Sequence, residues 1–274
     1  MRKGAGMTKL VEIKAKGIEY KYGYDTRLPD DLDTAHCHDA YEILFVVSGT
    51  GKYVVEGTTF DIKPITLMVI RPFEYHHVLL DPAVPYERYV LKFDPAILSA
   101  DMAARFADMM SADADVGGKY YSAYDIRPEI FSIFDRFEFL NVLPDAEKNS
   151  YSAMLLSEIM LFLSACRGEQ MLYKEDELGA KVIRYLNENI HRNISLDNLA
   201  RRFFVSKYHL CRAFKKHNGI SVHGYINKKR VMYAKRLIES GETASGAAYR
   251  VGFGDYSSFY RAYVKVLGKA PTSD

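Results

Sequence analysis

Short hydrophobic runs separated by turn-forming residues fill the first third of the chain, between Lys9 and Phe93. The runs are rich in β-branched and aromatic residues, and the clearest are residues 41–47, 52–55, 67–70 and 86–93. Gly, Pro and Asp divide them at intervals of several residues to about a dozen, the spacing typical of a β-sandwich or β-barrel. We therefore predict an N-terminal all-β module.

After Pro95 the pattern changes to helical spacing, first over residues 128–140 and then over residues 150–166. Apolar positions of the second segment recur three and four residues apart, as they do on one face of a helix. These positions are Met154, Leu155, Leu161, Phe162 and Ala165, with Glu158 among them. Such a stripe either packs on its own domain or seals a homodimer, and we assign it as a helical dimerisation segment.

A polar stretch without periodicity, residues 168–177, follows this helix and is the predicted linker. It divides the chain into residues 1–167 and residues 178–274. A chain of 274 residues is long enough for two domains with separate cores. We expect an α+β multidomain protein, with a β-barrel and helical segment first and an all-α domain second.

The second part repeats itself at an offset of 49 residues, which indicates a duplicated unit. The matched pairs are Leu210 with Phe259, Arg212 with Arg261, Ala213 with Ala262, Phe214 with Tyr263, Lys216 with Lys265 and Gly219 with Gly268. Helix N-caps are predicted at Ser195 and Ser206 in one copy and at Thr243 and Asp255 in the other. Each copy then consists of helix, tight turn and helix. The segment between the copies, residues 222–240, predicts one long helix that fixes their separation.

Charge is distributed unevenly along the chain, although the net charge is only +2. Residues 1–177 hold 19 Lys and Arg against 29 Asp and Glu, whereas residues 178–274 hold 18 against 6. So basic a domain attracts polyanions by counterion release, and nucleic acid is the usual polyanion in a cell. We find no signal peptide or membrane-length apolar run, and the three cysteines are far apart. We expect a cytoplasmic protein with no membrane association.

Helix-turn-helix units place their second helix in the major groove, where Arg bonds guanine and aromatic groups contact the thymine methyl. The outer faces of the two predicted second helices carry Arg212 and Arg261, which we predict to contact bases. Their predicted companions are Tyr208, Cys211 and Lys215 in the first helix, and Tyr256, Ser257 and Tyr260 in the second. A helical bundle that is merely basic is the alternative.

Residues 194–271 resemble the tandem DNA-binding domain of AraC/XylS-type regulators. The matching stretches are ISLDNLARRFFVSKYHLCRAFKKHNGIS, YINKKRVMYAKRLI and AAYRVGFGDYSSFYRAYVKVLGKAP. The resemblance implies that both second helices bind double-stranded DNA, and it adds Lys207 to the DNA-facing residues. One departure is the stretch 244–247, Ala-Ser-Gly-Ala, where the family has a bulky aliphatic pair. It predicts a weakly helical start for the second unit.

A histidine-rich string in the β module, His36-Cys37-His38-Asp39-Ala40-Tyr41-Glu42, is similar to the cupin barrel. With the later His76 it supplies three imidazoles and one carboxylate, a set that suits iron, manganese or nickel. A metal-dependent cupin enzyme or a metal-sensing regulator is therefore one hypothesis. Against it, Ile65 and Phe73 stand where metal-binding cupins usually have Gly.

The resemblance to AraC-type regulators favours a different use of the same pocket, because such regulators bind a small effector there without an obligatory metal. We expect no metal, cofactor or catalytic residue. The predicted effector-binding residues are His36, His38, Tyr41, Glu42, His76 and Arg88. Their imidazole, carboxylate and hydroxyl groups would suit a polyhydroxylated ligand such as a carbohydrate.

Together these observations predict a transcriptional regulator that joins a cupin-like effector-sensing and dimerisation domain to a tandem helix-turn-helix domain. Its expected partners are double-stranded DNA, a small-molecule effector and a second copy of the chain. RNA polymerase is a further candidate partner.

Overall fold

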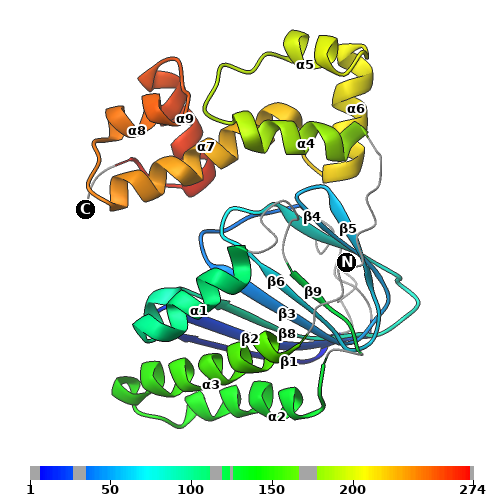
Figure 1. Ribbon diagram of the computed structural model, residues 1–274, viewed down its shortest axis with the longest axis vertical. Coiled ribbons are helices and arrows are strands. Elements are labelled where there is room, and N and C mark those ends of the chain that lie inside the picture. The colour runs from blue at the N-terminus through cyan, green and yellow to red at the C-terminus, as the bar shows by residue number, and fades with distance from the viewer. Residues whose placement is uncertain (1–6, 27–34, 112–118, 124–125, 167–177, 272–274) are drawn as a thin grey trace, which may run out of the picture. The chain divides into compact units, whose positions relative to one another are not determined.

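The computed structural model describes residues 7–26, 35–111, 119–123, 126–166 and 178–271 (Figure 1). The chain divides into two compact units, Met1–Lys174 and Glu175–Asp274. The predicted linker lies outside the described residues. The first unit is β-rich and the second is helical, as the hydrophobic pattern predicts.

Two antiparallel sheets form the first unit. The larger has the order β1-β2-β8-β3-β6-β9 and the smaller the order β5-β4-β7. The strand bounds are β1 (Met7–Ala15), β2 (Ile18–Asp25), β3 (Tyr41–Ser48), β4 (Gly51–Val55), β5 (Thr58–Ile62), β6 (Thr66–Ile70), β7 (His76–Leu80), β8 (Tyr86–Phe93) and β9 (Lys119–Tyr121). An isolated bridge between His36 and His76 joins the start of β7 to the chain before β3. The two sheets do not close into a full barrel.

Alternation along β3 gives the large sheet two buried faces. Ile43 and Phe45 belong to the core on the helix-covered face, whereas Leu44 and Val46 belong to the core shared with the small sheet. In this register Glu42 lies opposite Lys92 of β8, on the same face of the strand as Leu44. A polar residue thus enters the space between the sheets at the start of β3.

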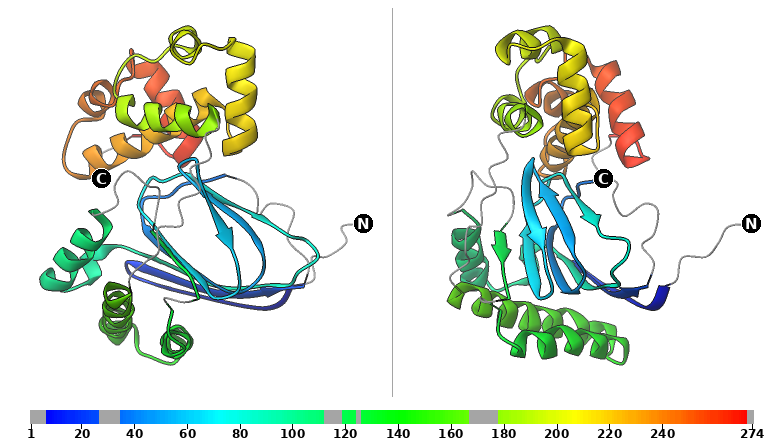
Figure 2. Two further views of the ribbon diagram at one scale, coloured as in Figure 1. Left: turned by 45° about the vertical axis from the view of Figure 1, so that its right-hand side comes forward. Right: turned by 90° about the vertical axis from the view of Figure 1, so that its right-hand side faces the viewer.

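Helices cover the outer face of the large sheet, where α2 and α3 lie side by side (Figures 1 and 2). Their bounds, with the two 3-10 turns, are η1 (Pro95–Ile97), α1 (Ala100–Ser111), α2 (Glu129–Arg136), η2 (Phe137–Asn141) and α3 (Asp145–Ala165). The predicted apolar stripe of α3 is only partly buried in the single chain. Met154 and Leu161 are 55% and 52% exposed, and the buried face consists of Ser152, Leu155, Leu156, Ile159, Met160 and Leu163. Apolar residues occur all around this helix, so spacing alone cannot select the packed face.

Six helices build the second unit, within the described range 178–271. They are α4 (Leu178–Asn189), α5 (Leu196–Arg202), α6 (Lys207–Asn218), α7 (Val222–Glu239), α8 (Ala244–Arg250) and α9 (Tyr256–Leu267). The predicted caps are confirmed: the side chains of Ser195, Ser206, Thr243 and Asp255 each accept a hydrogen bond from the backbone N–H three residues on. Thr243 thus supports α8 despite its weakly helical sequence.

The repeat has two offsets, because the second helix-turn-helix copy contains one residue more than the first. The caps of the first helices, Ser195 and Thr243, are 48 residues apart, whereas those of the second helices, Ser206 and Asp255, are 49 apart. The N–H groups of Val205 and Phe253 both close the turn, onto Ala200 and Ala248 respectively. Gly254 is therefore the additional residue, between the turn and the second cap.

Candidate functional site

The recognition helices α6 and α9 present the predicted DNA-binding residues on their outer faces. The side chains of Lys207, Tyr208, Arg212 and Lys215 on α6 are exposed, and so are those of Tyr256, Ser257, Tyr260 and Arg261 on α9. Cys211 is half-buried. The opposite faces are held by Leu210 and Phe214 in α6 and by Phe259 and Tyr263 in α9, all of them buried. Packing therefore fixes which face of each helix meets solvent.

The two arginines differ in their surroundings. Within the described part of the chain, no hydrogen bond or ion pair restrains the Arg212 guanidinium, whereas that of Arg261 donates to Ser258 Oγ at 3.3 Å. Arg261 also lines a surface hollow of about 380 Å³, which continues to His223, Asn227 and Lys265. Sequence patterns did not single out His223 and Asn227, because the start of α7 lies outside both helix-turn-helix copies.

A buried arginine ties the connection between α4 and α5 to α7, the helix that joins the copies. Arg230 of α7 is 8% exposed, and its guanidinium donates to the carbonyls of Ile190 at 2.9 Å and Arg192 at 2.6 Å. Burial lowers the pKa of Arg230 below its usual value. Gly252 packs close by: a Cβ there would lie 2.6 Å from the His191 carbonyl oxygen. The connection between α4 and α5 thus packs against both α7 and the turn of the second copy.

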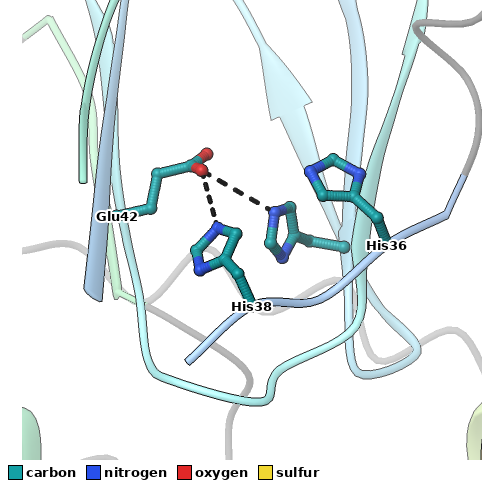
Figure 3. Close-up of side chains that lie close together, drawn as sticks. His36, His38 and Glu42 are labelled. Atoms are coloured by element: carbon teal, nitrogen blue, oxygen red, sulfur yellow. Dashed lines mark hydrogen bonds and ion pairs between the residues drawn. The ribbon is translucent and has the colours of Figure 1, made fainter. Parts of the chain in front are cut away.

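The structure gathers four of the six predicted effector-binding residues at one end of the two sheets, and Figure 3 shows His36, His38 and Glu42 of this group. His38 Nε2 lies 2.9 Å from Glu42 Oε2, and His76 Nε2 lies 3.9 Å from the same oxygen. The His36 ring meets the His76 ring edge-on, with 4.4 Å between centroids. His36 is exposed and His38 half-buried, whereas Glu42 and His76 are buried. We call these four residues the His–Glu cluster.

Burial and charge set the protonation of the cluster. Burial lowers the pKa of His76 to about 3, and the neighbouring Glu42 opposes this shift only in part, so the ring is neutral at neutral pH. For Glu42, burial favours the protonated form, but the His38 hydrogen bond and the nearby positive charge of Lys92 outweigh it. The pKa of Glu42 is consequently below its usual value, and the group is a carboxylate.

Tyr41 and Arg88 do not join the cluster. Tyr41 precedes Glu42 in the same strand and points to the opposite face, where its ring stacks on Phe93 at 5.7 Å. Arg88 lies opposite Val46, four residues along β3 from Glu42. Its guanidinium donates to the buried carboxylate of Asp25.

Sequence reasoning missed two neighbours of the cluster. Lys92 Nζ lies 3.5 Å from Glu42 Oε2, and the Tyr53 ring stacks near His76 with 6.1 Å between centroids. The register of β3 and β8 would have identified Lys92, because it pairs Lys92 with Glu42. That pairing cannot be obtained from hydrophobic alternation, which gives the face of a residue but not its cross-strand partner.

The two positions at which the sequence departs from the cupin pattern keep the backbone conformation that glycine favours. Ile65 has φ 62° and Phe73 has φ 68°, both in the left-handed region. The Phe73 N–H donates to the His38 carbonyl at 2.8 Å, which holds this turn against the histidine string. The departures therefore change side chains and leave the turns intact.

Comparison with known protein families gives one match in each unit. Residues 20–114 match a family described as "AraC-like ligand binding domain", and residues 199–273 match one described as "Helix-turn-helix domain". Together the two matches take in more than half of the chain. The His–Glu cluster lies in the first, and α6 and α9 lie in the second.

Among similar curated proteins, the HTH-type transcriptional activator RhaS of Klebsiella pneumoniae (strain 342) is 24% identical over 255 residues, covering 90% of this chain and 89% of its own length. RhaS of Enterobacter sp. (strain 638) is 22% identical over 254 residues, with the same coverage. The HTH-type transcriptional regulator YbfI of Bacillus subtilis (strain 168) is 24% identical over 229 residues, covering 81% of this chain and 79% of its own.

Among solved structures, the DNA-binding domain of AdpA in complex with a target DNA is 25% identical, over 35% of this chain and 87% of that one, with a TM-score of 0.33. ToxT of Vibrio cholerae O395 is 12% identical over 93% of this chain and 96% of its own, with a TM-score of 0.35.

The relatives named here are regulators of transcription, so the enzyme hypothesis has no support among them. No helix in the described ranges combines the length and apolar composition needed to cross a membrane. The first unit contains the match to the ligand-binding family. The second unit contains the match to the helix-turn-helix family, and that match includes both outward-facing recognition helices. The chain belongs to the AraC family of DNA-binding transcriptional regulators.

Proposed function

We propose that the protein controls transcription by placing α6 and α9 in successive major grooves on one face of the duplex. The observation that carries this proposal is the equivalent placement of Arg212 and Arg261, both exposed and both on the sixth residue of a 12-residue helix that starts at an N-cap. In this proposal the two arginines contact guanine edges. Tyr208, Tyr256 and Tyr260 contact thymine methyl groups or sugars.

The remaining predicted DNA-binding residues have supporting roles. Lys207, Lys215 and Ser257 contact phosphates, which set the register of the protein on the duplex without selecting sequence. Cys211 is half-buried and packs against the groove wall. The His223, Asn227 and Lys265 side chains beside Arg261 add polar and basic groups that a phosphate could reach.

We propose that a small effector binds in the first unit at the His–Glu cluster. Imidazole nitrogens, a carboxylate and the Lys92 ammonium converge there. Such groups bind hydroxyl and anionic oxygens, so carbohydrates and small organic acids are the ligand classes to screen. Binding would favour one arrangement of the two units over another, and so alter promoter binding or contact with RNA polymerase.

The proposed working form is a cytoplasmic homodimer that contacts its partner copy through the outer surface of α3. Support comes from Met154 and Leu161, which expose more than half of their side-chain surface on this helix. Phe139 of η2, 51% exposed, extends the apolar surface and contacts Tyr151 of α3 at a ring separation of 5.6 Å.

Binding to a selected operator DNA tests the DNA-binding proposal. Arg212→Ala and Arg261→Ala should each weaken specific binding by about tenfold to a hundredfold, since a bidentate Arg–guanine pair contributes about 1–3 kcal/mol. Arg184→Ala, which removes an exposed positive charge from α4, is the matched control and should have little effect. Footprints of the two variants should lose protection in different, neighbouring major grooves. Wild-type affinity and an unchanged footprint in the double variant would disprove the proposal.

A further inference from the structure

The tautomers of two cluster histidines are fixed by their backbone contacts. His38 Nδ1 lies 2.9 Å from the Ala40 carbonyl oxygen, and His76 Nδ1 lies 2.9 Å from the Glu74 carbonyl oxygen. A carbonyl oxygen can only accept a hydrogen bond, so each Nδ1 must carry the hydrogen. In the neutral ring Nε2 is then an unprotonated acceptor.

Both of these Nε2 atoms lie near a third acceptor, the Glu42 carboxylate: His38 Nε2 is 2.9 Å from it (Figure 3), and His76 Nε2 is 3.9 Å from it. The His76 side chain is 1% exposed, and its Nε2 has no hydrogen-bond partner among the residues that the structure describes. A charged His38 ring and Lys92 would supply hydrogen bonds to the Glu42 carboxylate, but His76 Nε2 would still lack a hydrogen-bond donor. Two imidazole nitrogens and a carboxylate that converge as electron-pair donors form an environment that favours a shared cation.

We propose that His36, His38, Glu42 and His76 bind one divalent first-row transition metal ion. One potential ligand atom from each residue lies within 4.8 Å of all the others. Two ligands on opposite sides of an ion are about 4.2 Å apart when each bond is about 2.1 Å long, so modest side-chain rotation brings the set onto one centre. The inference goes beyond the proposed function and does not depend on DNA binding.

The donor set selects the class of metal. Imidazole suits zinc, iron, nickel and copper, and a carboxylate extends the range to manganese, whereas calcium and magnesium prefer oxygen ligands alone. Metal-binding histidines usually donate their other ring N–H to a carbonyl or carboxylate, as His38 and His76 do here.

The site would connect segments that are distant in the sequence. Glu42 belongs to β3 in the large sheet and His76 to β7 in the small sheet, while His36 and His38 precede β3. A bound ion would therefore link the two sheets at this end of the ligand-binding unit. Since binding to the folded state alone favours folding, the metal should raise the thermal stability of that unit.

Metal titration of the full chain tests the site. The protein is treated with EDTA, dialysed, and titrated with Mn²⁺, Co²⁺, Ni²⁺ and Zn²⁺ by calorimetry, with elemental analysis of the dialysed complex and Co²⁺ absorption spectra. We expect one ion per chain and a rise in Tm for at least one metal. His76→Ala and Glu42→Gln should weaken its binding by about a hundredfold or more, since even the loss of a hydrogen-bond partner of a metal ligand costs about 10–100-fold.

Two further variants keep the test decisive if a buried substitution unfolds the protein. His36 is exposed, so His36→Ala should fold normally and still weaken metal binding. His223→Ala removes an exposed histidine from the second unit and should leave binding unchanged. The proposal is overturned by less than stoichiometric binding of every metal tried, by wild-type affinity in His36→Ala, or by an equal loss in His223→Ala. Operator binding by each variant is measured separately. This measurement distinguishes a failure of the metal-site proposal from a failure of the DNA-binding proposal.

Discussion

Phe204 combines two unfavourable features at the turn of the first helix-turn-helix unit. Its φ is 56°, in the left-handed region, and its side chain is 95% exposed. The equivalent turn residue of the second unit is Gly252, with φ 97°. The geometry of the turn thus demands a conformation that glycine adopts freely, and the first unit adopts it with an aromatic residue.

Replacing Phe204 should consequently stabilise the helical domain, Glu175–Asp274. We expect Phe204→Asn to raise the free energy of unfolding by up to about 1 kcal/mol, because Asn tolerates the left-handed conformation and little packing is lost. Urea denaturation monitored by circular dichroism measures the change. Phe203→Asn is the matched control and should destabilise, since Phe203 has φ −95° and packs edge-on against Tyr185. A loss of stability in Phe204→Asn would show that the exposed ring has a stabilising contact.

For individual residues, the sequence predicts which side chains have the chemistry of a site better than it predicts which of them lie close together in the fold. Side-chain chemistry identified His36, His38, Glu42 and His76, and all four converge. Tyr41 was placed with them only because it is adjacent in sequence, and strand alternation sends it to the other face.

Among the elements, those with explicit start signals were the most predictable. Capping side chains define where α5, α6, α8 and α9 begin, because each satisfies backbone N–H groups that the helix leaves free. The strand β9 was not predicted, since it has only three residues and its place beside β6 depends on tertiary pairing. The packed face of α3 could not be selected from the sequence for a similar reason: an apolar helix can pack on several sides.

The exposed side of α3 leads to a prediction about assembly. Leu161→Glu should weaken self-association by tenfold or more, because it would bury a charge without a partner in the proposed dimer interface. Folding should be unaffected, as the Leu161 side chain is 52% exposed in the single chain. Sedimentation-velocity experiments over a concentration series provide the measurement. Ala104→Glu adds the same charge at an exposed position of α1 and should leave the association constant unchanged. Equal association of both variants and wild type would place any dimer contact elsewhere.

For the whole molecule, the separation of charge between the two units governs how binding responds to salt. The basic excess of residues 178–274, 18 Lys and Arg against 6 Asp and Glu, favours release of counterions from DNA. Phosphate-contacting residues contribute to the slope of log Kobs against log salt, about 0.9 per phosphate neutralised. Base-contacting residues contribute chiefly to the ratio of specific to non-specific affinity.

Lys215 and Arg212 should separate these two effects, although both lie exposed on α6. Lys215→Ala should lower the magnitude of the salt slope by about one and weaken operator and random DNA alike, since a phosphate contact carries no sequence information. Arg212→Ala should instead reduce mainly the preference for the operator. Lys216→Ala removes an exposed charge from the neighbouring position and serves as the control. Fluorescence anisotropy at several salt concentrations gives both the salt slope and the preference for the operator. An identical change in Lys215→Ala and Lys216→Ala would contradict the prediction, because it would mean that only the net charge of α6 affects DNA binding.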